Sequence, residues 1–148
     1  MPPTSLPFQD LLGDSTPAVV TDLMSGLINA ALAASADTIH PLEVVLGSGA
    51  RVNVVPRPGL LPHPFTSAPE LSASGPSPAT MVYAVGMLGA MAATRDLPSP
   101  PRDPRAHAGW LHDLSGKLRQ RWGDDPGSHA AIHLLLRCLA FDPAQRPN

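Results

Sequence analysis

The sequence predicts a mainly α fold with one small β-hairpin, in a single domain over residues 1–148. Two observations favour helices: apolar residues recur at helical spacing over residues 17–36, and residues 80–94 are apolar all round. A third favours the hairpin, because residues 43–55 hold two short β-type runs joined by a glycine turn. A chain of 148 residues can bury a core without help from a metal or a disulfide.

Composition limits the class of protein. Hydrophobic residues make up 43% of the chain and charged residues 15%, which excludes a highly charged disordered segment. A net charge of −2 gives no electrostatic reason to expect a nucleic-acid partner. Cys138 is the only cysteine, so no intramolecular disulfide forms. With no signal-peptide pattern and no apolar run that reaches the roughly 20 residues of a membrane span, we expect a cytoplasmic protein without a membrane partner.

The 19 prolines and the high alanine and arginine content are typical of a GC-rich bacterial genome. Proline clusters at 56–69, 76–78 and 98–104 predict long loops there. At the N-terminus, residues 6–13 are expected to form a short helix that ends at a glycine. Thr16 should then cap the next helix, because Pro17 suits its first position.

Two amphipathic helices are predicted near the C-terminus. The first covers residues 110–122 and is expected to face inward with Trp110 and a set of leucines. The second is expected to begin at a cap formed by Ser128 and to stop before residue 142, which precedes a proline.

The C-terminal stretch 135–147 contains a Cys-Leu pair followed by Asp-Pro-Ala-Gln-Arg-Pro. It resembles the end of a protein-kinase domain, and other kinase-like motifs precede it in the family's order. Residues 68–70 resemble the Ala-Pro-Glu that closes a kinase activation segment, and 82–86 resemble the start of the large buried helix. Residues 41–46 resemble the Lys-Pro-Glu-Asn-Val-Leu of the catalytic loop, and the hairpin falls where kinases have theirs. The resemblance covers about residues 5–147.

The resemblance implies a structural ion pair between Glu70 and Arg146. In kinases the Glu of Ala-Pro-Glu pairs with the Arg of the terminal Asp-Pro-x-x-Arg, and both partners are kept here. A buried guanidinium needs a carboxylate, because an unpaired buried charge is costly. The alternative is that both residues are ordinary surface charges.

The resemblance also implies that catalysis is lost. Phosphoryl transfer needs a base-like Asp, metal-binding residues and a Lys under a Gly-rich loop. Thr38 stands at the catalytic Asp, residues 36–37 replace the His-Arg before it, and Glu43 replaces the metal-binding Asn. The Asp-Phe-Gly position is 57–59, which keeps only the glycine, and Met81 replaces the Asp that opens the buried helix. We therefore expect no enzyme activity, no catalytic residue, no cofactor and no metal.

An isolated lobe of this kind is similar to the KIND domain, the kinase non-catalytic C-lobe domain. The similarity implies a scaffold or interaction module that binds a helical or extended segment of another protein. Two alternatives stay open: a pseudokinase-type regulator of a serine/threonine kinase, and an unrelated small-ligand-binding domain. Kinases usually continue into one more helix, so the sequence is expected to be either a fragment of a longer protein or a naturally shortened lobe.

For the binding surface, the sequence favours the helix over residues 110–122. Trp110, Lys117, Arg121 and Trp122 combine aromatic and basic character, which is common at interaction hot spots. The alternative is that the apolar residues pack inward and the charges form a solvated face. A metal site is not expected at the His pair 129 and 133, because no third ligand is evident.

Overall fold

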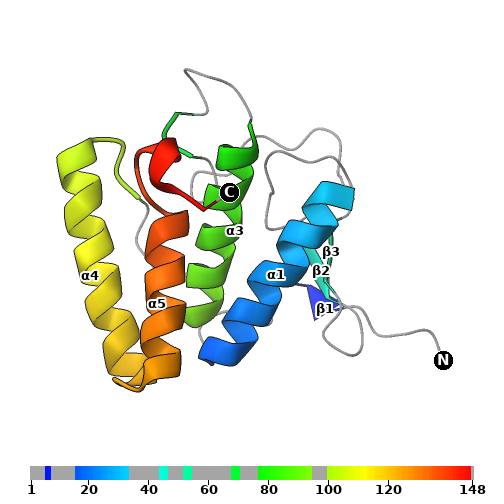
Figure 1. Ribbon diagram of the computed structural model, residues 1–148, viewed down its shortest axis with the longest axis horizontal. Helices are drawn as coiled ribbons and strands as arrows, with labels where there is room; N and C mark the ends of the chain where they lie inside the picture. Colours follow the sequence, from blue (N-terminus) through cyan, green and yellow to red (C-terminus); the bar gives the residue numbers. More distant parts are fainter. Residues whose placement is uncertain are drawn as a thin grey trace.

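The computed structural model describes residues 6–7, 16–33, 44–46, 52–54, 68–70, 77–94 and 100–147, with the backbone alone at 6–7, 31–33, 44–46 and 52–54. The elements in chain order are β1 (Leu6–Pro7), α1 (Pro17–Ala33), β2 (Val44–Leu46), β3 (Val52–Val54), α3 (Pro78–Ala93), α4 (Pro104–Trp122), α5 (Pro126–Cys138) and the 3₁₀ helix η3 (Pro143–Gln145). The described part of the chain is mainly helical (Figure 1), which confirms the prediction of a mainly α fold.

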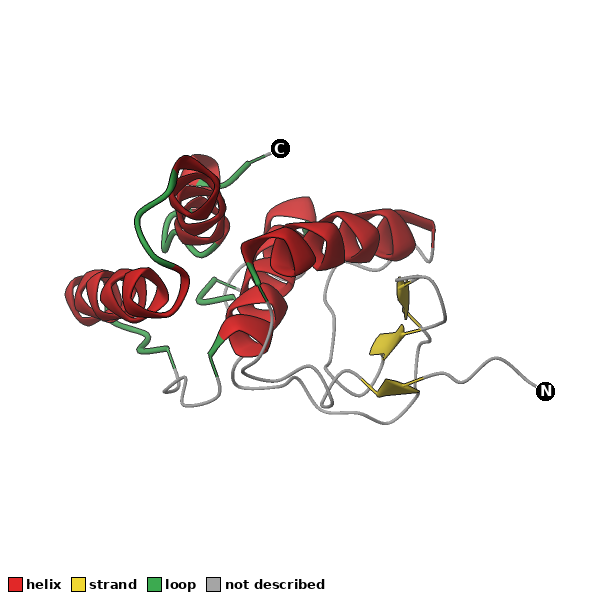
Figure 2. Cartoon of the chain, turned by 90° about the horizontal axis from the view of Figure 1, so that it is seen from below, coloured by secondary structure: helices red, strands yellow, loops and turns green. Residues whose placement is uncertain are grey.

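The helices form a row with α3 in its interior. Helix α3 packs against both α1 and α5, which also pack against each other, and α4 packs against α5 at the end of the row in Figure 1. The strands lie beyond α1, on the side of the molecule away from α4 (Figure 2), and β3 packs against α1. This order places one continuous core between α1, α3, α4 and α5.

Helix α3 is buried on nearly every side, as its uniformly apolar sequence predicts. Its start is fixed by a capping box, in which Ser77 and Thr80 each bond the other's backbone N–H. Its middle approaches α5 so closely that a Cβ atom on Gly86 would lie 2.8 Å from the Cβ of Cys138. Glycine at this position is therefore a condition of the helix–helix packing.

Every helix in the described residues begins in the same way. A side-chain oxygen accepts a hydrogen bond from the first turn, and a proline occupies the first helical position, where its missing N–H is not needed. The pairs are Thr16–Pro17, Ser77–Pro78, Asp103–Pro104, Asp125–Pro126 and Asp142–Pro143. The Thr16 cap predicted from the sequence is confirmed by a 3.3 Å bond from the Val19 N–H to Thr16 Oγ1.

Two predicted helix starts are wrong. Helix α4 begins at Pro104, within the segment expected to be a loop, because Asp103 caps it and accepts a bond from the Ala106 N–H at 2.9 Å. Helix α5 begins at Pro126 with Asp125 as its cap, so Ser128 lies inside the helix. There its Oγ lies 2.6 Å from Asp125 Oδ1, and this contact reinforces the cap.

The strands form an antiparallel sheet in the order β1-β2-β3, with Val44 opposite Val54 in the β2–β3 pair. The turn expected between these two strands falls on residues 47–51, which lie outside the described part. The expected helix over 6–13 is wrong at its start, because Leu6–Pro7 pairs with β2. Pro7 is compatible with this edge position, since an edge strand does not need every N–H in the ladder. Residues 8–13 lie outside the described part.

Candidate functional site

The most connected polar side chain in the described structure is Arg146, which follows η3 and has a fully buried side chain. Its Nη1 and Nη2 atoms donate to the two carboxylate oxygens of Glu70 at 2.6 and 2.9 Å. The remaining N–H groups donate to the carbonyl oxygens of Ala140 (2.8 Å), Ala79 (3.0 Å) and Phe141 (3.2 Å). All five guanidinium donors are thus used, and the burial of the charge is compensated.

Glu70 brings a distant segment into this contact, since it lies 76 positions before Arg146. Burial would raise the pKa of the Glu70 carboxyl, but the hydrogen bonds and the charge of Arg146 outweigh it, so the pKa is lowered from 4.5. Arg102 also binds the turn at residues 68–70, because its Nη1 donates a hydrogen bond to the Ala68 carbonyl at 3.1 Å. The ion pair predicted from the sequence is confirmed.

An aromatic cluster covers the other side of the guanidinium. The Arg146 Cζ atom lies 4.9 Å from the centroid of the Tyr83 ring, within the range of a cation–π contact. The Tyr83 hydroxyl lies 3.2 Å from Nε2 of His107, which has no exposed surface. Trp110 and Phe141 pack against the His107 ring, with centroids 5.5 and 5.3 Å away. The cluster joins α3, α4 and the segment before η3 behind the ion pair.

The buried histidine is the part of this cluster that sequence reasoning missed. His107 precedes Trp110, Leu114 and Leu118 on the inward face of α4, at spacings of three, seven and eleven residues. Helical periodicity could therefore have identified it as a core position. Its Nδ1 atom has no hydrogen-bond partner, and no other buried side-chain N or O among the described residues lacks one.

We predict that the fold loses stability in mild acid because of His107. Burial and the nearby charge of Arg146 lower its pKa below the ordinary 6.5. As the pH falls, His107 therefore takes up a proton in the unfolded chain before it does so in the folded protein. Its contribution to the free energy of unfolding is complete above about pH 6.5 and decreases below it. Urea unfolding between pH 7.5 and about pH 5 should show this decrease, and His107→Gln should reduce its slope. The matched control is His133→Gln, because His133 is exposed on α5. An unchanged slope in His107→Gln would contradict the assignment.

The four residues predicted to bind a partner have different environments. Trp110 is only 7% exposed and belongs to the core, so the expectation that it is a surface anchor is corrected. The inward position follows from helical spacing, since Trp110 shares one face of α4 with Leu114 and Leu118, four and eight residues further on. Trp122 is half-buried against the core, while Lys117 and Arg121 are exposed.

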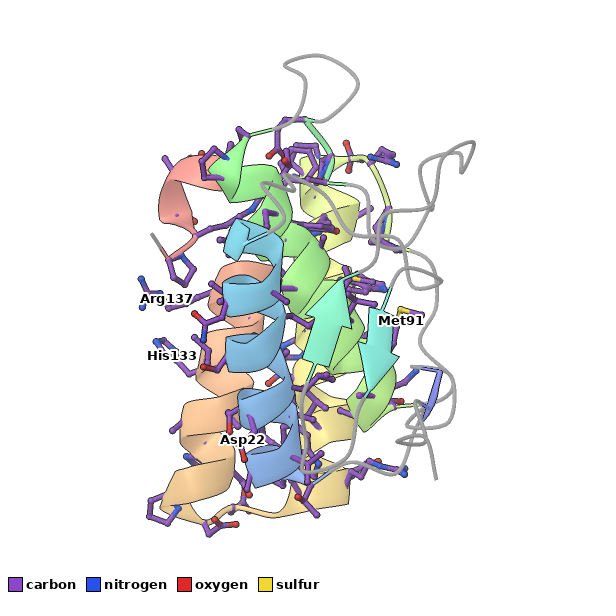
Figure 3. The ribbon with its side chains drawn as sticks, turned by 90° about the vertical axis from the view of Figure 1, so that its right-hand side faces the viewer. Asp22, Met91, His133 and Arg137 are labelled. Carbon is purple, nitrogen blue, oxygen red and sulfur yellow. The ribbon has the colours of Figure 1, made fainter. Side chains whose placement is uncertain are left out.

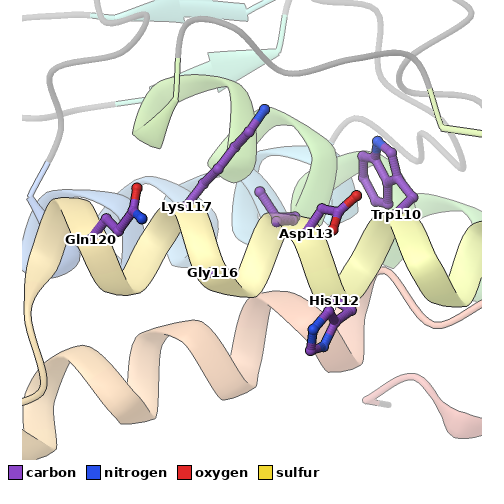
Figure 4. Close-up of a pocket in the computed structure, with 7 residues that line it drawn as sticks. Trp110, His112, Asp113, Gly116, Lys117 and Gln120 are labelled. Carbon is purple, nitrogen blue, oxygen red and sulfur yellow. The ribbon is translucent and has the colours of Figure 1, made fainter.

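One flank of α4 carries part of this predicted surface (Figure 4). Trp110, Asp113, Lys117 and Gln120 lie along it and line a hollow of about 380 Å³. Only the edge of the Trp110 ring is available to this hollow, because most of the side chain is buried. Whether a protein binds at this flank stays a prediction.

Four of the five sites at which the sequence suggests lost catalytic residues lie outside the described residues. They are Thr38, Glu43, residues 36–37 and residues 57–59. Met81, the fifth such position, lies in the first turns of α3 and is buried. The described residues around Arg146 join segments that are remote in the sequence.

Possible metal ligands do not cluster in the described ranges. No group of three or more His, Cys, Asp or Glu side chains gathers there in a way that could hold a metal ion. His129 Nε2 lies 3.5 Å from Asp124 Oδ1, and burial raises the pKa of the Cys138 thiol to about 11. No described helix combines the length and apolar character needed to cross a membrane.

No model of a protein family matches the chain, and a search of curated proteins finds no match.

Proposed function

We propose that this chain is a non-catalytic protein–protein interaction module of the kinase C-lobe type, similar to the KIND domain. The observation that carries the proposal is the ion pair between Glu70 and Arg146, with its two hydrogen bonds of 2.6 and 2.9 Å. The kinase resemblance specifies this pair between segments 76 positions apart. Its presence favours a common architecture over a chance similarity of short motifs.

The arrangement of the helices adds support. The resemblance assigns residues 82–86 to the large central helix, and α3 is the helix buried between α1 and α5. It assigns residues 135–147 to the helix end and the turn that close the lobe, and Arg146 follows that turn. Since the residues at the catalytic positions cannot perform phosphoryl transfer, binding is the function that such a lobe retains.

Binding of a partner segment is the direct test. The chain, immobilised through a tag, is expected to retain a protein from a lysate of the source cells. A peptide from that protein should then bind the free chain in a calorimetric titration, because an interaction module recognises a segment outside its parent protein. A chain that binds a small ligand tightly, and no protein, would contradict the proposal.

Nucleotide should not stabilise the chain. A ligand present at about 100 times its Kd raises stability by about 2.7 kcal/mol, which a thermal melt detects readily. With millimolar ATP and magnesium we expect an unchanged Tm, since the positions corresponding to the metal-binding residues are Glu43 and 57–59. A genuine kinase serves as the positive control. A clear increase in Tm would contradict the loss of the nucleotide site.

A further inference from the structure

Two adjoining hollows follow the line between α4 and α5. The larger, of about 480 Å³, lies toward the start of α4 and the end of α5. The smaller, of about 310 Å³, lies toward the start of α5. His133 and Leu136 line both hollows, so the two form one groove, called here the α4–α5 groove.

The floor of the α4–α5 groove is apolar. Leu111 of α4 and Leu136 of α5 are partly buried and pack against the core below. Phe141 continues this surface at the end of α5 and is also only partly buried. An apolar side chain from another molecule could cover these three residues, and the gain would be about 25 cal/mol for each Å² removed from water.

Basic and imidazole side chains border the groove. On α5 they are His129, His133 and Arg137, at positions i, i+4 and i+8 of one helical face. Figure 3 shows His133 and Arg137 projecting from α5 in the same direction. Arg119 contributes a second guanidinium from α4. Arg137 lines the larger hollow and Arg119 the smaller, so each hollow has one guanidinium, from a different helix.

Among the residues that line the groove, only Asp142 is acidic, and it lies at one end. Its Oδ1 already accepts a bond from the Ala144 N–H at 3.0 Å, as the cap of η3. At the other end, His129 is 3.5 Å from the exposed Asp124. Along its length the groove therefore offers one guanidinium in each hollow, with His133 lining both, in a chain whose net charge is −2.

We infer that the α4–α5 groove binds an acidic segment of a partner protein. The segment places an apolar side chain on Leu111, Leu136 and Phe141, and its carboxylates accept hydrogen bonds from Arg119 and Arg137. Eight residues of α5 separate His129 from Arg137, a rise of about 12 Å, which matches about four residues of extended peptide. Charge complementarity favours an acidic segment, because a carboxylate can accept two parallel hydrogen bonds from one guanidinium group. This inference rests on the proposed function and specifies its partner.

A library of random peptides displayed on phage tests the groove. The full chain is used for selection, and a double variant, Arg119→Glu with Arg137→Glu, serves for counter-selection. Both arginines are exposed, so the variant should keep the Tm within a few degrees. Peptides enriched on the wild type are expected to contain Asp or Glu around one apolar residue. Their binding should weaken about tenfold or more in the double variant and also at high salt.

The control variant is Lys117→Glu with Arg121→Glu. It changes the net charge of the protein by the same amount as the groove variant, but both changes lie on α4. Lys117 lines the hollow of Figure 4, outside the α4–α5 groove, so binding should be retained. Peptides that bind the groove variant as well as the wild type, or that are not acidic, overturn the inference and leave the proposed function standing. If neither peptides nor any cellular protein binds, the proposed function fails as well.

Discussion

Replacing Glu70 with alanine is expected to cost about 3–5 kcal/mol of unfolding free energy, because it leaves a buried guanidinium without its carboxylate. Arg146 has no exposed side-chain surface and cannot turn to water without leaving its carbonyl partners. Globular domains are stable by only about 5–15 kcal/mol, so the loss is a large fraction of the total. At about 2–4 °C for each kcal/mol, the Tm should fall by roughly 10 °C. Urea and thermal unfolding measure both quantities.

Replacing Arg146 with methionine should cost at least as much. It removes the partner of Glu70 and also the donors to the carbonyls of Ala79, Ala140 and Phe141. Changing both charged residues, as Glu70→Leu with Arg146→Met, should cost less than the two single changes added together, since neither charge is then left alone.

The matched control for the ion pair is Arg105→Ala, which removes an exposed arginine in the first turn of α4. Its effect should stay within about 0.5 kcal/mol. The cost of Glu70→Ala should persist in 1 M salt, because buried pairs are screened less than exposed ones. If Glu70→Ala lowered the free energy of unfolding by less than about 1 kcal/mol, the pair would behave as an exposed ion pair, and the burial of Arg146 would be contradicted.

Alanine at Gly86 is expected to destabilise the fold, although alanine favours a helix over glycine by about 1 kcal/mol. The new Cβ would lie 2.8 Å from the Cβ of Cys138 and 3.2 Å from Cδ2 of Leu139. The Cys138 Cβ is attached directly to the backbone of α5, so α3 and α5 must separate. Overpacking of this kind costs about 1–3 kcal/mol, which leaves a net loss of up to about 2 kcal/mol. The midpoint of urea unfolding reports it.

The same substitution at Gly116 should change the stability in the opposite direction. Gly116 lies in α4, is exposed, and has no atom within 4 Å of an added Cβ. Gly116→Ala should therefore stabilise the protein by about 0.5–1 kcal/mol through helix propensity alone. If both variants shifted stability in the same direction, the close approach of α3 to α5 would be in doubt.

The candidate site was predictable in part. The resemblance of residues 68–70 and 135–147 to kinase motifs implied that Glu70 pairs with Arg146, and the structure contains this pair. Nothing in the sequence indicated the three carbonyl partners of Arg146. These are backbone groups, which every residue has, and only the turn after α5 and its packing against the start of α3 bring them to the guanidinium.

The misassigned helix starts have a local cause. Asp103–Pro104 and Asp125–Pro126 carry the same signal as Thr16–Pro17, a capping side chain followed by proline. In a chain with 19 prolines, those near Pro104 were interpreted as part of a loop. A helix predicted to begin at residue 110 also left out His107, which lies on the same buried face as Trp110.

The sequence by itself determined the mainly α class and the burial of α3, because helical periodicity is a property of neighbouring residues, while the pairing of Glu70 with Arg146 was implied only by the resemblance to kinase motifs. Tertiary structure alone decided that His107 and Trp110 stand behind the ion pair, since their contacts come from elements distant in the chain. It also decided the extended pairing at Leu6–Pro7, where a partner strand prevailed over a weak local preference. The α4–α5 groove is also a feature that only the tertiary structure decided, because a groove between two helices exists only once they are packed together.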